Sequence, residues 1–498
     1  MAKHFNTQKE PTPIKRSFDA ARFGKTSDLT QSKNVNADLV ASLETLRGRC
    51  RQIANNDPYV ARAMSLWRNY IIGPTGIDLH VQSKLTNGAL DKSTNEKIER
   101  AWAEFCELGN CTTDGGFTFT ELCKIIIETM ARDGEVFLIK RKGPRFGRFG
   151  YQLDLIPIEQ FASYYTGINR DNGNVIFQSV EFNRDLRPVA YWLSSKPEPM
   201  NSSYLLSFNQ KVPDIRVPAE DCFHLFERHY IGQVRGFPWI CNSVLNLHHL
   251  NVYKTTELEM ARIATLDQIY FTMEAGTEGI SDRDMNAAME INLELEPGQS
   301  TILPRGVKPQ KVDYNNPNSN MPDFIKSQLK GVAAGLQLSY AALSSDIEGV
   351  TFANARLAAL EDQVSYQNRQ QWVIDHFLNP LYKDWLKYQI LASNINVPFS
   401  KLDKVSRVKW TPRGFRSVNL VENARAAQML NGMGLLSRTQ LSSELFGVDW
   451  NETLDLLQFE AEELKKRDLV MVSDVPAAQL EQKELEEPTD TEMRNQNN

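Results

Sequence analysis

The sequence has few cysteines, and their arrangement does not suggest a disulfide framework. It has six among 498 residues, and no two of them have the Cys-x-x-Cys spacing. They are Cys50, Cys106, Cys111, Cys123, Cys222 and Cys241. Small proteins held together by disulfides carry denser and more regular cysteines, so we expect six reduced thiols.

The motifs of the common enzyme families are missing as well. We find no Walker A sequence, no Gly-x-Ser-x-Gly elbow, no His-Glu-x-x-His, no protein-kinase set and no Gly-x-Gly-x-x-Gly behind a strand. Catalysis generally requires such a constellation of groups. The sequence therefore predicts a protein that is not an enzyme and that has no catalytic residues and no cofactor.

A metal site is not expected either. Cys222 and His224, followed by His229, lack both the zinc-binding spacing and a second ligand pair, which favours ordinary core residues. Four acids beside a loop or on a helix face could in principle bind a cation: Asp346, Glu348, Glu361 and Asp362. Acids in such places are usually solvated, and we expect that here.

Long apolar runs are also lacking, and the first residues do not have the layout of a signal peptide. We therefore expect a soluble, cytosolic chain without a membrane partner. Basic residues number 56 and acidic residues 62, giving a net charge of -6, which argues against a protein that wraps nucleic acid over its whole surface. Hydrophobic residues make up 41%, enough for a folded body of about three units.

The two ends of the chain differ from this body in charge. Residues 1–36 are polar and mainly basic, and Pro11 and Pro13 oppose a long helix there, so we expect a flexible basic arm. Residues 467–498 are rich in glutamate and end on Asn-Gln-Asn-Asn, which predicts an acidic, disordered tail.

The first half of the body has a mixed α+β pattern. Leu39, Leu43 and Leu46 begin a helical stripe that Pro58 interrupts. Further helices are expected at 95–108 and 120–132, and strands at 77–81, 135–141, 151–156, 175–182 and 189–193. Turn sequences at 142–144 and 171–173 indicate that neighbouring strands are antiparallel.

The second half predicts long helices separated by loops. Residues 240–274 contain neither glycine nor proline and could form one helical rod. A loop-rich insert follows at 275–320, in which 282–293 has a pattern that allows a short helix, and a second helix is expected at 322–338. A small-residue loop at 339–351 leads to a long helix from Phe352, with a kink or restart at Asn379-Pro380, and 418–466 is helical again with a break at 432–434.

Two basic features could contact nucleic acid. Lys326 and Lys330 lie one helical turn apart, which suits either a phosphate backbone or an ordinary solvated helix side. The segment from Arg141 to Gly150 mixes basic and aromatic residues, which fits either a nucleic-acid contact or a solvated hairpin loop.

Several stretches, in this order along the chain, resemble the lambda family of portal proteins from tailed bacteriophages. The resemblance covers roughly residues 40–465. The stretches are residues 49–63 (Arg-Cys-Arg-Gln-Ile-Ala-Asn-Asn-Asp-Pro-Tyr-Val-Ala-Arg-Ala), 71–77 (Ile-Ile-Gly-Pro-Thr-Gly-Ile), 224–226 (His-Leu-Phe), 232–239 (Gly-Gln-Val-Arg-Gly-Phe-Pro-Trp), 352–358 (Phe-Ala-Asn-Ala-Arg-Leu-Ala) and 410–415 (Trp-Thr-Pro-Arg-Gly-Phe).

This resemblance implies a helix-rich α+β portal fold that assembles as a ring of about twelve subunits at one capsid vertex. Double-stranded DNA would be packaged and ejected through the ring. The implied regions are the arm 1–36, an α+β wing 37–238, a stem helix 239–274, a clip 275–320, a second stem helix 321–338, a tunnel loop 339–351, a long wing helix and return segment 352–415, a helical crown 416–466 and the tail 467–498.

The implied partners are double-stranded DNA, terminase, major capsid and scaffold proteins, and head-completion or adaptor proteins. The protein would belong to the virion and occupy the host cytoplasm during assembly. We expect the DNA channel to be lined by Lys326, Lys330, Ser344, Ser345, Asp346 and Glu348. Two alternatives stay open: another head-tail adaptor or minor capsid protein, and an enzyme of unrecognised type.

Overall fold

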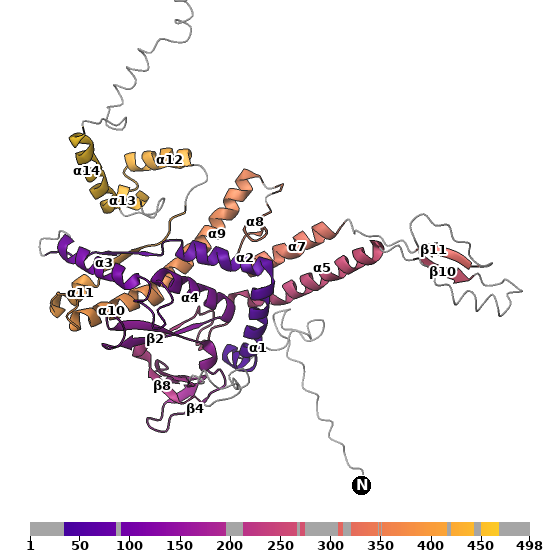
Figure 1. Ribbon diagram of the computed structural model, residues 1–498, viewed down its shortest axis with the longest axis horizontal. Coiled ribbons are helices and arrows are strands. Elements are labelled where there is room, and N and C mark those ends of the chain that lie inside the picture. Colours follow the sequence, from indigo (N-terminus) through magenta and orange to yellow (C-terminus); the bar gives the residue numbers. More distant parts are fainter. Residues whose placement is uncertain are drawn as a thin grey trace, which may run out of the picture.

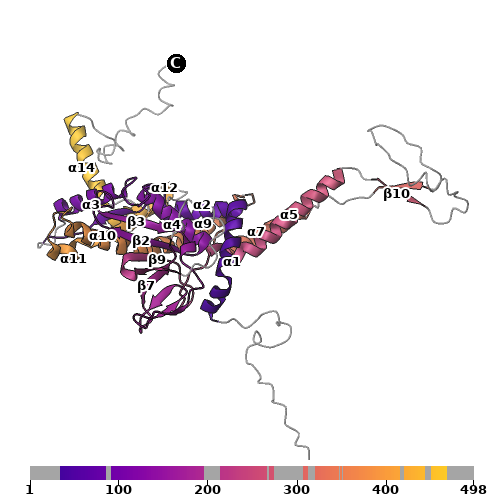
Figure 2. The same cartoon turned by 60° about the horizontal axis from the view of Figure 1, so that its bottom comes forward.

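The computed structural model describes residues 34–85, 91–195, 213–265, 269–273, 307–311, 320–346, 348–349, 351–415, 420–442 and 450–467. A body of helices and small sheets carries a pair of projecting helices, and a two-stranded ribbon lies beyond their far end (Figures 1 and 2). The predictions for the arm 1–33, the helix at 282–293 and the tail 468–498 fall outside the described residues.

Four helices open the body, and their boundaries follow from capping chemistry. They are α1 (Val35–Asn56), α2 (Pro58–Trp67), α3 (Lys92–Cys106) and α4 (Phe119–Asp133), with a π-helical turn, η2 (Arg68–Ile72), after α2. The predicted break at Pro58 is confirmed, because Asp57 ends α1 and its carboxylate accepts from the amide of Tyr59 at 2.9 Å. Thr118 and Glu121 form a capping box at the start of α4.

Within the described residues, antiparallel strands make up four small sheets. One pairs β1 (Asp78–Val81) with β12 (Val408–Thr411); a second has the order β3 (Tyr151–Ile156), β2 (Val136–Lys142), β9 (Cys222–Leu225). The third has the order β4 (Gly167–Ile168), β5 (Val175–Phe177), β6 (Val180–Phe182), β7 (Pro188–Leu193), β8 (Ile215–Pro218). The fourth pairs β10 (Ile269–Met273) with β11 (Val307–Lys311).

The prediction of one strand over 175–182 was wrong. The segment is a tight hairpin in which Phe177 pairs with Val180, and both turn residues, Gln178 and Ser179, have positive φ (51° and 67°). Such two-residue turns usually contain glycine or asparagine, and neither residue occurs at 178–179, so no turn was predicted here. Burial stabilises the turn instead, since both residues are fully enclosed.

An aromatic cluster around Trp102 connects the body to the long helical segment at 352–391. Its ring lies 5.0 Å from that of Trp385 and 5.9 Å from that of Trp410, centroid to centroid. The segment comprises α9 (Phe352–Val373), a π-helical turn η7 (Ile374–Leu378) and α10 (Asn379–Leu391). The helix does not restart at Asn379, because Leu378 and Asn379 both have helical backbone angles; the irregularity next to the predicted kink is the π-helical turn η7.

The projecting pair consists of α5 (Val244–Thr265), which follows a 3-10 turn, η6 (Trp239–Ser243), and α7 (Met321–Gly335). The prediction of one continuous helix over 240–274 was therefore wrong, because the strand β10 occupies 269–273, where Ile, Tyr, Phe and Thr favour a strand. At the base of the pair, the Ser243 hydroxyl donates to the Val332 carbonyl at 3.1 Å. A Cβ on Gly335 would lie 2.4 Å from that hydroxyl, so glycine allows this close packing.

The remaining helices are short or lie near the C-terminus. They are α8 (Tyr340–Ser344), α11 (Leu402–Val405), α12 (Leu420–Gly432), α13 (Arg438–Leu441) and α14 (Trp450–Lys466), with short 3-10 turns at η3 (Ile158–Gln160), η5 (Ala219–Asp221) and η8 (Phe399–Lys401). The predicted helix break at 432–434 is confirmed, with Gly434 at φ 72°. Among the described helices, none has the length and apolar character needed to cross a bilayer.

Candidate DNA channel site

The six predicted channel residues lie on α7 and on the segment that follows it. Lys326 and Lys330 occupy successive turns of α7. The segment 339–351 was predicted to be a loop, but its first part forms the short helix α8, which Ser339 caps by accepting from the amide of Ala342. Ser344 ends α8; Ser345, Asp346 and Glu348 come after it.

Lys326 has a carboxylate partner within this segment. Its ammonium lies 3.5 Å from Oδ2 of Asp346 and 5.7 Å from the centre of the Tyr340 ring. The Tyr340 hydroxyl donates to the same oxygen at 2.9 Å. The structure therefore brings together two of the predicted residues, and it joins α7 to the segment after α8 through opposite charges.

The same contacts set the ionisation of Asp346. The amide of Glu348, then the Tyr340 hydroxyl and the Lys326 ammonium, lower the pKa of Asp346 below its usual value. Desolvation, followed by the hydrogen bond to Asp346, raises the pKa of Tyr340. At neutral pH the carboxylate is thus charged and the phenol protonated, which is the combination that this contact requires.

The backbone around this contact is tightly turned. Gln337, after α7, and Ser345, after α8, both have positive φ, at 56° and 57°. The Ser344 hydroxyl donates to the Tyr340 carbonyl at 2.7 Å and accepts from the Asp346 amide at 3.1 Å. Ser344 therefore shapes the turn instead of presenting a free hydroxyl.

Ser339 and Asp362, which were not among the predicted channel residues, anchor the segment to α9. The Ser339 amide and hydroxyl donate to the two Asp362 oxygens at 2.8 and 2.6 Å. Asp362 was expected to be solvated but is only 8% exposed, and burial raises its pKa despite the bonds from Ser339. The expectation failed because α8 covers this position, which only the tertiary structure reveals.

Three of the six residues remain exposed: Lys330, Ser345 and Glu348. In the part of the chain that the structure describes, no cluster of three or more His, Cys, Asp or Glu side chains could hold a metal ion. The segment can therefore present one lysine, one hydroxyl and one carboxylate to a polyanion, beside a second lysine whose charge is already balanced.

A second charged cluster lies where the body meets α5, and it uses the residues of the 232–239 stretch. Glu135, directly after Gly134, is fully buried and accepts from Arg235 Nε at 2.8 Å, from the Gly236 amide at 2.9 Å, from His224 Nε2 at 2.8 Å and from Arg47. His224 is thus a partner of a carboxylate, as its neighbours show, and is not arranged for zinc.

Arg235 extends this cluster into the five-stranded sheet. Its guanidinium donates to the carbonyls of Phe161, Ala162 and Gln178 at 2.9, 3.3 and 3.0 Å. It also lies 3.9 Å from the centre of the Phe161 ring. One side chain therefore connects the body, the tight hairpin and the segment that leads into α5.

Ionisation in this cluster follows from burial and neighbouring charge. Burial would raise the pKa of Glu135, but the Arg235 and Arg47 guanidinium groups and the contact with His224 hold it well below its usual range. Burial lowers the pKa of His224 although Glu135 opposes this. The cluster is therefore a carboxylate between two guanidinium groups, with a neutral imidazole at neutral pH.

The basic and aromatic segment from Arg141 to Gly150 begins in the last two residues of β2 and continues as the loop that leads to β3. Arg141 lies 2.7 Å from a carboxylate oxygen of Asp154, and Arg148 lies 2.9 Å from one of Glu104. Two of its arginines thus already have acidic partners, which is typical of a hairpin loop and leaves little free positive charge for nucleic acid.

Comparison with known proteins identifies relatives over most of the chain. The family model described as phage portal protein, lambda family, matches residues 25–370. The probable portal protein of Halomonas phage phiHAP-1 is 28% identical, over 84% of this chain and 81% of its own. Portal protein B of Escherichia phage lambda is 22% identical, over 81% of each. A solved chain from the neck of an empty gene transfer agent particle aligns at 12% identity with a TM-score of 0.44, covering 84% of this chain and 95% of that one.

The family match spans well over half of the chain. It confirms the family indicated by the sequence motifs, and with it the helix-rich α+β portal fold, the function of a portal protein, and a structural place in the virion. The chain belongs to the lambda family of phage portal proteins.

Proposed function

We propose that this protein assembles as a ring of about twelve subunits at one capsid vertex, and that double-stranded DNA is packaged and ejected through the centre of the ring. The observation that carries the proposal, beside family membership, is the shape of the chain. Two helices, α5 and α7, project together from the body, and the β10–β11 ribbon lies beyond them (Figure 2). Such a projection has little to pack against in a single chain and suits a tube built from several copies.

In this proposal the regions named from the sequence keep their roles. The α5–α7 pair forms the stem, the 275–320 insert the clip, and the segment 339–351 the tunnel loop. The clip would dock terminase during packaging and head-completion or adaptor proteins afterwards, while capsid and scaffold proteins surround the wing.

Charge along the proposed channel is consistent with DNA that must slide. Each phosphate that a protein neutralises adds salt-dependent affinity, so a channel with many free lysines would hold its DNA. In the described segment, Asp346 balances Lys326, whereas Lys330 is exposed. We therefore propose that Lys330 supplies the sparse phosphate contact, that Lys326 does so when its ion pair opens, and that Ser345 and Glu348 face the same channel.

The assembly is tested by measuring the mass of the purified protein by light scattering and imaging the same fraction by electron microscopy. Rings near 680 kDa, twelve times the 56.7 kDa of one chain, with a hole wide enough for duplex DNA, are expected. A monomer or dimer at every concentration and salt tested would contradict self-assembly into a ring.

The channel is tested by reversing both lysine charges, Lys326→Glu with Lys330→Glu, in a phage that depends on the introduced copy. We expect intact rings and a loss of DNA-filled particles. Lys383→Glu with Lys387→Glu is the matched control, because these exposed lysines have the same spacing on α10. Normal DNA-filled particles from the Lys326 and Lys330 variant would contradict the channel assignment.

A further inference from the structure

The N-terminal half of α9 carries a row of apolar side chains that nothing in the described chain covers. Leu357, Leu360 and Val364 are 60%, 49% and 56% exposed. They are spaced by three and four residues and so lie on one face of the helix. Further along the same rod, Phe377 and Leu381 are fully buried.

This row also carries one negative charge. Glu361 lies one turn after Leu357 and is exposed on the same face. Among the described residues it forms no ion pair. Exposed Arg356, one turn before Leu360, flanks the row on its other side. Three large apolar side chains beside a carboxylate are unusual for helix positions that face only water, and they favour a partner with an apolar hollow and a basic side chain next to it.

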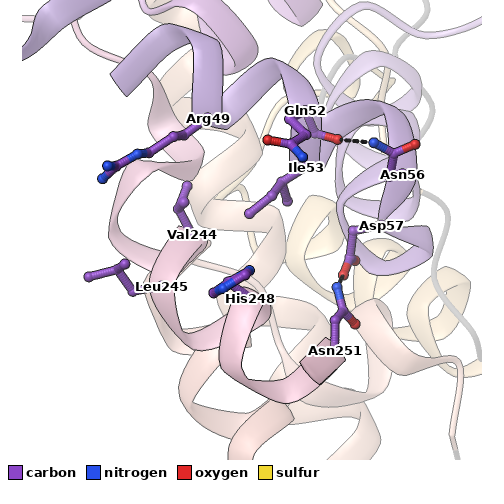
Figure 3. A pocket seen from close by; sticks show the side chains of 9 residues that line it. All are labelled: Arg49, Gln52, Ile53, Asn56, Asp57, Val244, Leu245, His248 and Asn251. Atoms are coloured by element: carbon purple, nitrogen blue, oxygen red, sulfur yellow. Dashed lines mark hydrogen bonds between the residues drawn. The ribbon is translucent and has the colours of Figure 1, made fainter. Parts of the chain in front are cut away.

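Such a hollow exists elsewhere on the same chain, between α1 and the start of α5 (Figure 3). It encloses about 440 Å³. Ile53 of α1 and Val244 and Leu245 of α5 supply its apolar wall, and Leu245 is 62% exposed.

The groove offers a basic partner for the carboxylate of the α9 row. Arg49 and His248 line it, and both are exposed. Its one acid, Asp57, is already engaged by the Tyr59 amide at 2.9 Å and by the Asn251 side chain at 2.8 Å. Arg49 forms no ion pair within the described part of the chain, so an incoming carboxylate would meet an available guanidinium.

The row cannot reach this groove within one subunit. In Figure 1, the N-terminal half of α9 rises on one side of α7, whereas α1 runs on the other side. A contact between two different surfaces of the same chain, made from one copy to the next, is heterologous, and a heterologous contact is what closes a cyclic ring.

We propose that the α9 row of one subunit packs into the α1–α5 groove of the next subunit in the ring, with Glu361 paired to Arg49 and His248 beside it. The proposal rests on the ring proposed above and assigns the surfaces that join its members. In this proposal the α9 row and the α1–α5 groove each bind a second copy of this chain, and not another virion protein.

Charge exchange provides the test. Glu361→Arg and Arg49→Glu are each expected to lower the yield of rings by at least about tenfold, because either change places like charges together, and the double variant is expected to restore it. Glu96→Arg and Arg100→Glu on α3 are matched controls at exposed positions outside both surfaces. Circular dichroism shows whether each variant is folded.

A cysteine pair gives a second, independent measurement. Leu360→Cys with Leu245→Cys should yield ladders of covalently linked subunits on mild oxidation, and neither single variant should do so. Folded single reversals that form normal rings, a double variant without rescue, or a cysteine pair that does not crosslink would each overturn the interface while the ring itself stands. A wild-type protein that never forms rings would overturn both.

Discussion

The buried cluster around Glu135 provides the most direct test of how this fold is held together. The change is Glu135→Gln, which keeps the size of the side chain and removes its charge. It leaves the guanidinium groups of Arg47 and Arg235, 6% and 0% exposed, without their shared carboxylate. Removing one partner from a buried ion pair commonly costs about 3–5 kcal/mol of unfolding free energy.

The structure indicates the lower end of that range. Arg235 keeps three carbonyl acceptors, and Arg47 Nε keeps the Asp133 carbonyl at 2.8 Å. Glutamine also retains an oxygen that can accept from the Gly236 amide. We therefore expect a loss of about 3 kcal/mol at pH 7.

The assay is denaturant unfolding followed by tryptophan fluorescence, under conditions where wild-type and variant chains are monomeric. Trp67 and Trp239, with ring centres 5.5 Å apart, report on the region next to the cluster. Glu159→Gln is the matched control, since Glu159 is about one-third exposed in its pair with Arg51 and should cost about 0–1 kcal/mol. A Glu135→Gln loss no larger than that of the control would refute the reasoning.

Three further predictions follow from the same structure. The pKa values of His224 and Glu135 are both lowered in the folded protein, so the unfolded chain binds more protons. The free energy of unfolding should therefore fall as the pH drops below 6.5 and again below 4.5. Denaturant unfolding at several pH values that showed no such loss would contradict this. Asp346→Asn should free Lys326 for phosphate and make DNA retention by purified rings stronger and more salt-dependent, whereas identical retention across a salt series would argue against a phosphate role for Lys326. Gly134→Ala should destabilise the body by about 3 kcal/mol, because φ is 91° and the new Cβ would lie 2.3 Å from the Phe237 backbone; an unchanged melting curve would disprove that contact.

Elements that depend on local signals could be predicted from the sequence. The end of α1 and the start of α2 follow from Asp57 and Pro58, which act within their own turn. The β2–β3 hairpin follows from two runs of strand-forming residues and from the glycines between them. These features need no distant partner.

Features set by distant contacts could not be predicted. The strand at 77–81 was expected, but its partner β12 lies far along the chain, so the pairing of Leu79 with Trp410 is invisible locally. The hairpin turn at Gln178 is bound by the Arg235 guanidinium, which donates to the Gln178 carbonyl from a segment far away in the sequence. Tertiary contacts thus override the local preference.

The candidate site shows the same division. Lys326 and Asp346 were each predicted to line the channel, but not to be partners of each other. They meet because α7 is followed by a left-handed turn at Gln337. Such a turn is normally predicted from a glycine, and none occupies this position. The role of Asp362 as an anchor for Ser339 was missed for a related reason, since Asp362 is shielded from water only by the folded position of α8.

The π-helical turn η7 has a consequence for the whole rod from 352 to 391. A π turn accommodates one more residue than a regular turn without breaking the helix. The residues of α10 therefore face other directions than a regular helix of the same sequence would give them. If the same five residues formed regular α-helical turns instead, α10 would be rotated by about 100° relative to α9. Tyr382 and Trp385 would then turn away from Trp102. The irregular turn therefore sets the rotational offset between the outward-facing apolar row and the inward-facing aromatic residues of a single rod.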